Sequence, residues 1–439
     1  MIIYNFWRGH PNGDLLPVQE MQEILTMMCS PANQESLRDS LQYSSDRGEA
    51  TLLKEISLFL RRHTLKDELP EVSMASKKIL MNDSSPPPPE LDMFLTHGVS
   101  HGLDLLCTAT TKKDDVVLVE RPTYFLAKDI FTSHNLRVQN LPMKKQPVTK
   151  TLMVDVEALG RGLKDGSIDV PRMIYIVPTH QNPTGNTMPL TDRLILVKLA
   201  RQYGILVAAD EVYHLLDWSS PSKRRPARFS VLDHLISKQS EPLTNVDISA
   251  KNNIGRMGCS VSVSSFTKIF APGVRCGWIE GPASIIDSLV DVGYIQSQGG
   301  CVPFVGNILR TALAEGLQDS ILDKLIISYK DRSKILCDIL ESESGIQIHH
   351  RPDGGYFLWV EFSNISSAEI FAVYCLDRGL KFMPGVRCDS VLEGFEQSGQ
   401  PKELCQHSAR LCFADMDIID VSDGAKLLVK LYREYTGKL

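Results

Sequence analysis

The chain has 439 residues, of which 43% are hydrophobic and 23% are charged, and its formal net charge is −6. This length exceeds one ordinary hydrophobic core, so we expect a large domain and a smaller one. The acidic balance argues against bulk nucleic-acid binding, which needs a basic face, and no apolar run is long enough to span a membrane. Ten scattered cysteines without a Cys-x-x-Cys pair indicate reduced thiols in a cytosolic setting.

The first 40 residues are predicted to form an N-terminal arm. An apolar start leads into Arg8-Gly9-His10-Pro11, whose glycine and proline mark a loop, and then into a helix over 18–28. We expect the arm to cross another part of the fold, with a frayed terminus as the alternative. Tyr43 precedes a helix over 50–63 and is either a core aromatic or a residue that reaches a ligand.

Apolar strands alternate with helices through the middle of the chain. Strands are predicted at 93–96, 116–120, 172–177, 205–209 and 261–263, with a further one at 276–279. This alternation is typical of a parallel α/β sheet. From about residue 305 longer helices and shorter strands predict a second, α+β domain.

Two segments interrupt this order. The four prolines at 86–89 predict an extended spacer or, alternatively, a ligand for a proline-recognition module. Residues 217–256 are predicted to be a surface insertion. Within it, Lys223-Arg224-Arg225 is either a solvated turn or a localisation signal.

Distinctive polar residues stand just after the predicted strands. In open α/β sheets, ligands bind beyond the carboxyl ends of the strands. We therefore expect these residues to converge on one crevice from different loops. They are Ser100, Tyr124, Asn182, Asp210, Tyr213 and Lys268.

The stretch 264–278 holds the most specific chemistry. A lysine amine reacts with an aldehyde when it is held partly desolvated, and Lys268 is a candidate. Arg275 can grip a phosphate with two hydrogen bonds, to which the hydroxyls of Ser265 and Thr267 can add. A cofactor that carries both an aldehyde and a phosphate would use all of these groups, and pyridoxal phosphate is such a cofactor. The alternative is a surface loop with incidental charges.

Other residues match what such a cofactor needs. A ring nitrogen that must stay protonated needs a buried carboxylate, for which Asp210 is the candidate. Tyr124 can stack on the ring, and Asn182 and Tyr213 can donate to its phenolic oxygen. Each residue also has a purely structural alternative, because Asp210 could cap a helix, Asn182 could be a turn residue and the tyrosines could be core aromatics. The glycine-bearing turn at 97–102, before a helix, is a natural phosphate cradle.

Taken together, these motifs resemble those of fold-type I pyridoxal-phosphate enzymes of the class I/II aminotransferase family. The resemblance runs from Phe6 to about residue 435 and is greatest to the branch of 2-aminoadipate, kynurenine and aromatic aminotransferases. It implies an α/β fold with a mainly parallel seven-stranded sheet, helices on both faces and a smaller α+β domain. The matching motifs are His180-Gln181-Asn182-Pro183-Thr184-Gly185, Asp210-Glu211-Val212-Tyr213, Ser265-Phe266-Thr267-Lys268, Gly354-Gly355-Tyr356-Phe357 and Arg410. The expected divisions are an arm over 1–40, which packs with the small domain, a large domain over 41–304 and a small domain over 305–439.

The resemblance also implies roles for residues. Lys268 would hold the cofactor and act as general base and acid, with Asp210 and Tyr124 as its catalytic partners. Arg410 would bind the substrate α-carboxylate, and Tyr43 would reach the phosphate of a partner subunit, which implies a homodimer with shared sites. The remaining implied cofactor contacts are Val99, Ser100, Asn182, Tyr213, Ser265, Thr267 and Arg275. The remaining implied substrate contacts are Asn182, Gly9 and Arg8, and no metal is implied.

The reaction itself is less specified than the cofactor. We expect amino-group transfer from 2-aminoadipate, an aromatic or another bulky apolar amino acid to a 2-oxo acid such as 2-oxoglutarate, by a ping-pong mechanism. A C–S β-lyase or a synthase on the same fold is the alternative, and a non-catalytic regulatory protein is a remote one. Such regulators carry an N-terminal helix-turn-helix, for which motifs that begin by Asn5 leave no room. Arg8 either reads a distal carboxylate of the substrate or faces solvent. Two departures from the family pattern are Val99-Ser100, where Ser-Gln is common, and Thr267, where serine is usual.

Overall fold

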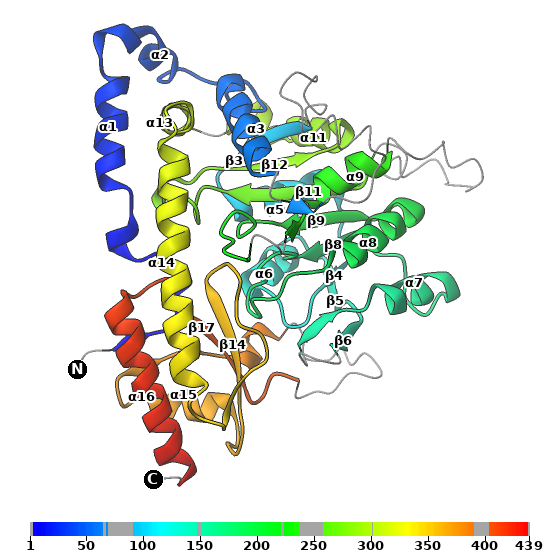
Figure 1. The fold of residues 1–439 in the computed structure, drawn as a ribbon. Helices are drawn as coiled ribbons and strands as arrows, with labels where there is room; N and C mark the ends of the chain where they lie inside the picture. The colour runs from blue at the N-terminus through cyan, green and yellow to red at the C-terminus, as the bar shows by residue number, and fades with distance from the viewer. Residues whose placement is uncertain are drawn as a thin grey trace.

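The computed structural model describes residues 3–64, 67–68, 91–146, 151–220, 224–237, 258–300, 302–389 and 404–437 (Figure 1). The proline run at 86–89 and Lys223 lie outside these ranges, as do 238–256 of the expected insertion. Across the described ranges, no helix combines the length and the apolar character that crossing a membrane requires.

Seven strands form the central sheet, in the order β3, β12, β11, β9, β8, β4 and β5. β12 runs antiparallel to both neighbours, whereas the other adjacent pairs are parallel, so the predicted mainly parallel sheet is confirmed. β5 was not predicted, because this edge strand is short and mostly polar. The bounds are β3 Asp92–Thr96, β12 Gly277–Gly281, β11 Ser260–Ser265, β9 Leu206–Asp210, β8 Met173–Ile176, β4 Val116–Val119 and β5 Arg137–Asn140.

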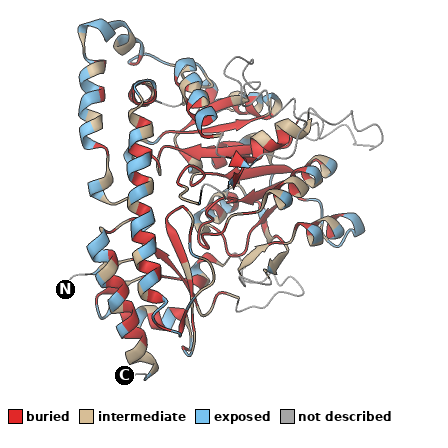
Figure 2. Ribbon diagram, viewed as in Figure 1, coloured by how far each residue is buried: buried red, intermediate tan, exposed pale blue. Residues whose placement is uncertain are grey.

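Both faces of this sheet are covered by helices. Alternate strand residues enter two separate cores, so Val117 and Val119 of β4 face one core while Val116 and Leu118 face the other. Figure 2 shows the central strands as buried, and β4 and β8 are accordingly apolar along their whole length. β11 is equally buried although four of its six residues are serine. The first core contains residues of α5 (Val99–Thr110), α6 (Phe125–Ser133) and α11 (Ala283–Val290). The second contains residues of α7 (Val156–Asp165), α8 (Leu190–Tyr203) and α9 (Phe229–Ser237).

The smaller α+β domain is built on a four-stranded antiparallel sheet in the order β13, β14, β17 and β16. The long helix α14 (Leu317–Leu340) packs along α16 (Ile418–Thr436) beside it (Figure 1). The strands are β13 Ile346–Ile348, β14 Phe357–Phe362, β17 Ser408–Cys412 and β16 Met383–Pro384, and α15 spans Ala368–Leu376.

The N-terminal segment joins this smaller domain. β1 (Tyr4–Asn5) pairs in parallel with β15 (Leu380–Lys381), and the Cys412 N–H donates to the Phe6 carbonyl over 2.8 Å. α1 (Val18–Met28) then packs on α13 (Pro303–Ala314), as does α3 (Ala50–Thr64). The residues after Phe6 are thereby held beside β17. Other elements are α2 Gln34–Asp39, α12 Gly293–Gln296, β6 Met143–Lys145, β7 Leu152–Val154, and the 3-10 helices Gly13–Leu15, Pro31–Asn33, Pro272–Val274 and Gly385–Cys388.

The described part of segment 217–256 departs from the expected surface insertion. β10 (Arg225–Pro226) pairs with β2 (Asp67–Glu68), and Phe229 enters the second core. Arg225 is only 6% exposed and its Nε donates to Asp67 Oδ1 over 2.7 Å, so the predicted solvated turn is wrong for this residue. A basic triplet looks solvated in the sequence because the buried carboxylate that pairs with it lies 158 residues away.

Candidate active site

A cavity of about 390 Å³ lies where the carboxyl ends of the central strands meet the smaller domain. All six residues predicted to converge line it, so the expected crevice is present. Tyr43 is not among the described lining residues and is 76% exposed. The lining includes Ser100, Tyr124, Asn182, Asp210, Tyr213 and Lys268, together with Arg8, Gly9, Val99, Ser265, Thr267, Arg275 and Arg410.

Lys268 stands in the turn that follows β11. Its Nζ donates to the Gly9 carbonyl over 2.8 Å and lies 5.0 Å from the centre of the Tyr356 ring. Burial disfavours the ammonium form and lowers the pKa of Lys268 to about 8. The neutral, nucleophilic amine is therefore accessible near neutral pH.

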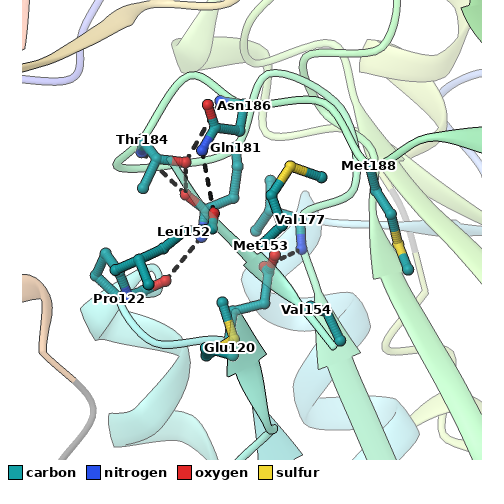
Figure 3. A pocket seen from close by; sticks show the side chains of 11 residues that line it. Glu120, Pro122, Leu152, Met153, Val154, Val177, Gln181, Thr184, Asn186 and Met188 are labelled. Atoms are coloured by element: carbon teal, nitrogen blue, oxygen red, sulfur yellow. Dashed lines mark hydrogen bonds between the residues drawn. The ribbon is translucent and has the colours of Figure 1, made fainter. Parts of the chain in front are cut away.

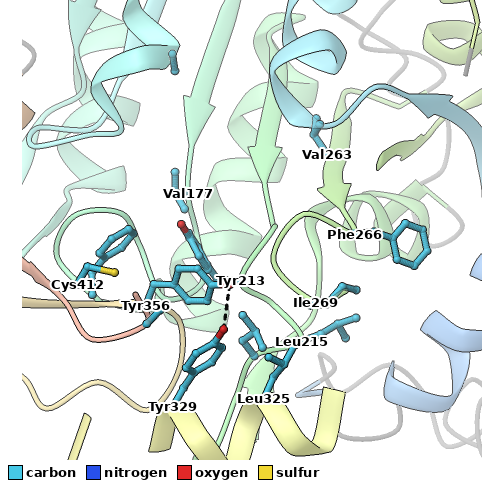
Figure 4. Close-up of a cluster of buried hydrophobic side chains, with 14 of the residues drawn as sticks. Val177, Tyr213, Leu215, Val263, Phe266, Ile269, Leu325, Tyr329, Tyr356 and Cys412 are labelled. Carbon is cyan, nitrogen blue, oxygen red and sulfur yellow. Dashed lines mark hydrogen bonds between the residues drawn. The ribbon is translucent and has the colours of Figure 1, made fainter. Parts of the chain in front are cut away.

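An aromatic wall holds the lysine turn in place. The Tyr356 hydroxyl donates to the backbone carbonyl of Lys268 over 3.2 Å, and the Tyr329 hydroxyl donates to Tyr356 over 3.4 Å (Figure 4). The Tyr213 ring centre lies 5.4 Å from that of Tyr356, and Tyr213 lines the cavity. Burial raises the pKa of Tyr213 well above its usual value, and that of Tyr124 to about 12, so both hydroxyls remain neutral donors.

Asp210 is the last residue of β9 and does not cap a helix. Its side chain is 4% exposed, and burial raises its pKa to about 6 even though a hydrogen bond from the Tyr175 hydroxyl to Oδ2, 2.9 Å long, favours the charged form. The Val212 N–H approaches Oδ1 at 3.4 Å. At neutral pH this is a buried anion at the cavity wall, suited to pair with a protonated ring nitrogen.

The turn at Gly98 and the side chain of Arg275 form the two sides of a cradle. α5 begins at Val99, so the free N–H groups of its first turn and its positive dipole end lie at the cavity. Gly98 has φ +90°, and a Cβ there would stand 2.9 Å from Arg275 Nη2, so the position requires glycine. Arg275 Nη2 also donates to the His97 carbonyl over 2.9 Å, which fixes the guanidinium beside this turn.

Two hydroxyls complete the cradle. Ser265 Oγ donates to Thr267 Oγ1 over 2.8 Å, and Arg275 Nη1 donates to the same Thr267 oxygen over 3.3 Å. A guanidinium, two hydroxyls and a helix N-terminus at one end of a cavity fit a phosphate monoester. With Lys268 and Asp210 on the same cavity, the residues present fit pyridoxal phosphate.

Arg410, on β17 of the smaller domain, also lines the cavity. Its Nη1 donates to Asn182 Oδ1 over 3.0 Å and its Nη2 donates to the Trp7 carbonyl over 2.7 Å. Its Nε is buried and has no hydrogen-bond partner among the described residues. The guanidinium carbon lies over the Phe357 ring, 4.3 Å from its centre. A buried guanidinium with an unsatisfied N–H is suited to bind a carboxylate by donating to it.

The loops after β4 and β8 are locked to one another next to the cavity (Figure 3). Gln181 Nε2 donates to the Pro122 carbonyl over 2.8 Å, and both the N–H and the hydroxyl of Thr184 donate to Gln181 Oε1, over 2.9 and 2.6 Å. These bonds fix Asn182 and Tyr124, each of which stands two residues or fewer from the locked positions. The sequence did not predict that Gln181 holds these two residues in place, although Gln181 lies within the family motif that begins at His180.

The sequence reasoning also missed the apolar lining. Trp7 is next to the predicted Arg8 in the chain, and Phe357 is the last residue of the family motif that begins at Gly354. Both residues therefore stand beside a feature that the sequence reasoning used. Met383 has no such feature beside it, because its place depends on the pairing of β16 with β17. The additional apolar lining residues are Trp7, Phe125, Leu126, Val177, Val212, Phe357 and Met383.

Comparisons with known proteins identify the family of the chain. The model of the family aminotransferase class I and II matches residues 86–424. The chain is 26% identical over 352 residues to aromatic-amino-acid aminotransferase 1 of Thermococcus litoralis, covering 80% of this chain and 74% of that protein. It is 25% identical over 342 residues to 2-aminoadipate transaminase of Thermus thermophilus, covering 77% and 74%. A crystal structure of the alpha-aminoadipate aminotransferase of Thermus thermophilus shares the fold, with a TM-score of 0.74, 22% identity and coverage of 100% of this chain and 94% of that one. The chain therefore belongs to the class I and II aminotransferase family, as a transaminase whose cofactor is pyridoxal phosphate.

Proposed function

We propose that the protein transfers the amino group of 2-aminoadipate, an aromatic or another bulky apolar amino acid to a 2-oxo acid such as 2-oxoglutarate, in a ping-pong reaction. The observation that carries this proposal is Arg410, a buried guanidinium with an unpaired Nε on the cavity that holds Lys268. Trp7, Phe125 and Leu126 line the same cavity and favour a large apolar substrate side chain. The names of the two relatives point to the same substrates.

In this proposal each residue acts on substrate or cofactor through an atom already on the cavity wall. When bound, pyridoxal phosphate supplies an aldehyde that attaches amines and a protonated ring that withdraws electrons from the substrate α-carbon. Lys268 Nζ anchors the cofactor and then takes and returns the α-proton, a task for which a pKa near 8 is well placed. Arg410 and Asn182 hold the α-carboxylate, so that the α-carbon stays close to that amine.

The cofactor is held at its two ends. Asp210 would pair with the ring nitrogen, Tyr124 would stack on the ring, and Tyr213 would donate to the phenolic oxygen along with Asn182. The phosphate would bind in the cradle between α5 and the hydroxyls described above. Gly9 and Arg8 stand at the substrate end, where the exposed Arg8 is suited to a distal carboxylate such as that of 2-aminoadipate. These assignments rest on residue chemistry and on shared cavity walls.

The proposal extends to the assembly. Tyr43 is exposed on the stretch before α3, and we assign it to the phosphate of a partner subunit in a homodimer. The divisions at residues 40 and 304 separate the arm, the large domain and the small domain. Nine described cysteines are free thiols, eight of them buried, which favours a reducing, cytosolic compartment.

A panel of amino donors with 2-oxoglutarate and with pyruvate tests the proposal. We expect the highest kcat/KM for 2-aminoadipate or for aromatic donors, with stoichiometric formation of the new amino acid. Each donor alone should release about one equivalent of oxo acid per active site, as a ping-pong reaction requires. Lys268→Ala, the control, should lose at least about 10³-fold in kcat. Release of pyruvate from cystathionine without an oxo-acid acceptor would instead identify a β-lyase.

A further inference from the structure

Tyr175 lies inside the central sheet, one strand away from Asp210. It stands on β8 directly opposite Ala208 of β9, so Asp210 is two residues further along the neighbouring strand, on the same face. Because the Ala208 side chain is small, it does not obstruct the diagonal path from Tyr175 to Asp210, and a tyrosine side chain is long enough to span that path. The Tyr175 hydroxyl reaches Asp210 Oδ2 at 2.9 Å.

The surroundings hold this tyrosine in one place. Its side chain is fully buried, and the Phe131 ring of α6 meets it edge-on with centroids 5.5 Å apart. Tyr175 is not among the residues that line the cavity within the described chain, so it touches Asp210 from behind. A buried hydroxyl can donate only one hydrogen bond, and here a carboxylate receives it.

We infer that Tyr175 is a positioning residue, which orients the Asp210 carboxylate toward the cavity and keeps it charged for the cofactor ring nitrogen. The inference rests on the role proposed above for Asp210. A single charged oxygen aimed at the ring requires the other oxygen to be held, and the Tyr175 hydroxyl holds it. A charge-assisted hydrogen bond of this kind is among the stronger ones in proteins.

Within the described part of the chain, four other ionisable groups on surrounding elements interact electrostatically with Asp210. Lys268, after β11, favours the charged carboxylate. Glu120, after β4, is buried, which raises its pKa to about 8, so below that pH it adds little negative charge of its own. Tyr124 and Tyr213 stay neutral at physiological pH. Two hydrogen bonds offset the burial of Asp210, and the one from the Tyr175 hydroxyl is shorter, at 2.9 Å, than the one from the Val212 N–H, at 3.4 Å.

The test is the affinity of the full-length apoenzyme for pyridoxal phosphate between pH 6 and pH 9, measured by fluorescence quenching. Tyr175→Phe keeps the ring that packs on Phe131 and removes only the hydroxyl. We expect about tenfold weaker binding than wild type at pH 6, with the ratio approaching one by pH 9 as Asp210 ionises in both proteins. The pH midpoint of the visible absorption band of the bound cofactor should also move. Tyr432→Phe, which removes another buried hydroxyl bonded to a backbone carbonyl (2.6 Å to Ser363), should match wild type in both measurements.

The Asp210→Asn background separates this inference from the role of Asp210 itself. If Tyr175 acts through Asp210, adding Tyr175→Phe to Asp210→Asn changes neither the affinity nor the absorption band further. This comparison also applies if Tyr175→Phe alone folds poorly, because asparagine removes the buried charge that the hydroxyl stabilises. Equal losses from Tyr175→Phe in both backgrounds, or a ratio to wild type that does not vary with pH, would overturn the inference. Unchanged binding in Asp210→Asn would overturn the role of Asp210 and this inference with it.

Discussion

Two buried aspartates of this protein differ in what surrounds them. Asp210 lies at the cavity, where burial raises its pKa to about 6. Asp67, on β2, is fully buried, and burial also opposes its charge, but His214 and Arg225 outweigh that effect and hold its pKa well below its usual value. Asp67 belongs to what we call the closed charge network, whose members are Asp67, Arg193, Glu211, His214, Arg225, Arg228 and Glu280.

The cavity and the closed charge network each contain one of two adjacent residues, Asp210 and Glu211. Asp210 faces the cavity, whereas Glu211 lies 3.8 Å from Arg193 in the network. In the network, Arg225 reaches Asp67 at 2.7 Å, although Glu211 Oε2 and Arg228 Nη1 have no hydrogen-bond partner among the described residues. At the cavity, Lys268, Asp210 and Arg410 are left with unmet charge or hydrogen-bonding capacity. A buried charge thus stabilises the fold where the protein pairs it. Where its partner would be a ligand, the same buried charge destabilises the ligand-free protein.

Breaking the network should have the largest effect on stability. Asp67→Ala leaves the buried guanidinium of Arg225 without its carboxylate, so we expect the free energy of unfolding to fall by about 3–5 kcal/mol at pH 7. Because the folded pKa of Asp67 lies below its unfolded value of about 3.8, its contribution is present above pH 4 and is lost as pH falls further. Urea unfolding of wild type and variant between pH 3 and pH 7 measures both.

Asp423→Ala is the control for Asp67→Ala, since that aspartate forms an exposed pair with Lys426 at 3.1 Å. It should leave the free energy of unfolding within about 0.5 kcal/mol of wild type. The kcat of Asp67→Ala per mole of bound cofactor should stay near wild type. Equal losses for the two aspartates would mean that burial does not distinguish them.

At the cavity, replacing a buried aspartate should raise the free energy of unfolding instead of lowering it. The pKa of Asp210 is raised from 3.8 to about 6, so the folded apoenzyme binds a proton more tightly than the unfolded chain, and stability is lost as pH rises through 6. Asp210→Asn removes this destabilising ionisation. We expect the free energy of unfolding of the apoenzyme variant to exceed that of wild type by about 2–3 kcal/mol at pH 8 and to equal it at pH 4, while the affinity for the cofactor falls. Chemical denaturation of apoprotein at the two pH values measures the gain, and a destabilised variant at pH 8 would contradict it.

These differences mark the limit of what the sequence could predict. The strands and the crevice were predictable, because buried strands are apolar runs and the polar residues that follow them must meet at one edge of the sheet. Lys268, Asp210 and Asn182 were found because each stands in a short motif, whereas Arg410 was found through the family resemblance. Their proposed roles remain predictions that the structure makes testable.

The closed charge network was not predictable in the same way. Arg225 was expected to be solvated, because its partner Asp67 is distant in sequence and only the pairing of β10 with β2 brings them together. Tyr175 looked like any other core residue of a strand, and its contact with Asp210 depends on the register of β8 against β9. Register and long-range pairing are tertiary properties, which a local pattern does not contain.

An exposed cluster completes the comparison and should show the smallest effect. Arg351 donates through Nε to Glu341 and through Nη2 to Asp338, each over 2.8 Å, so its geometry is as good as that of Arg225. Its side chain, however, is 45% exposed, and water screens both carboxylates whether or not the arginine is present. Arg351→Met keeps most of the aliphatic stem and should change the free energy of unfolding by less than about 1 kcal/mol, with a smaller change still in high salt. Urea titrations at low and high salt measure this, beside Asp67→Ala as the reference. If Arg351→Met proved as harmful as Asp67→Ala, then hydrogen-bond geometry rather than burial would decide the worth of an ion pair in this protein.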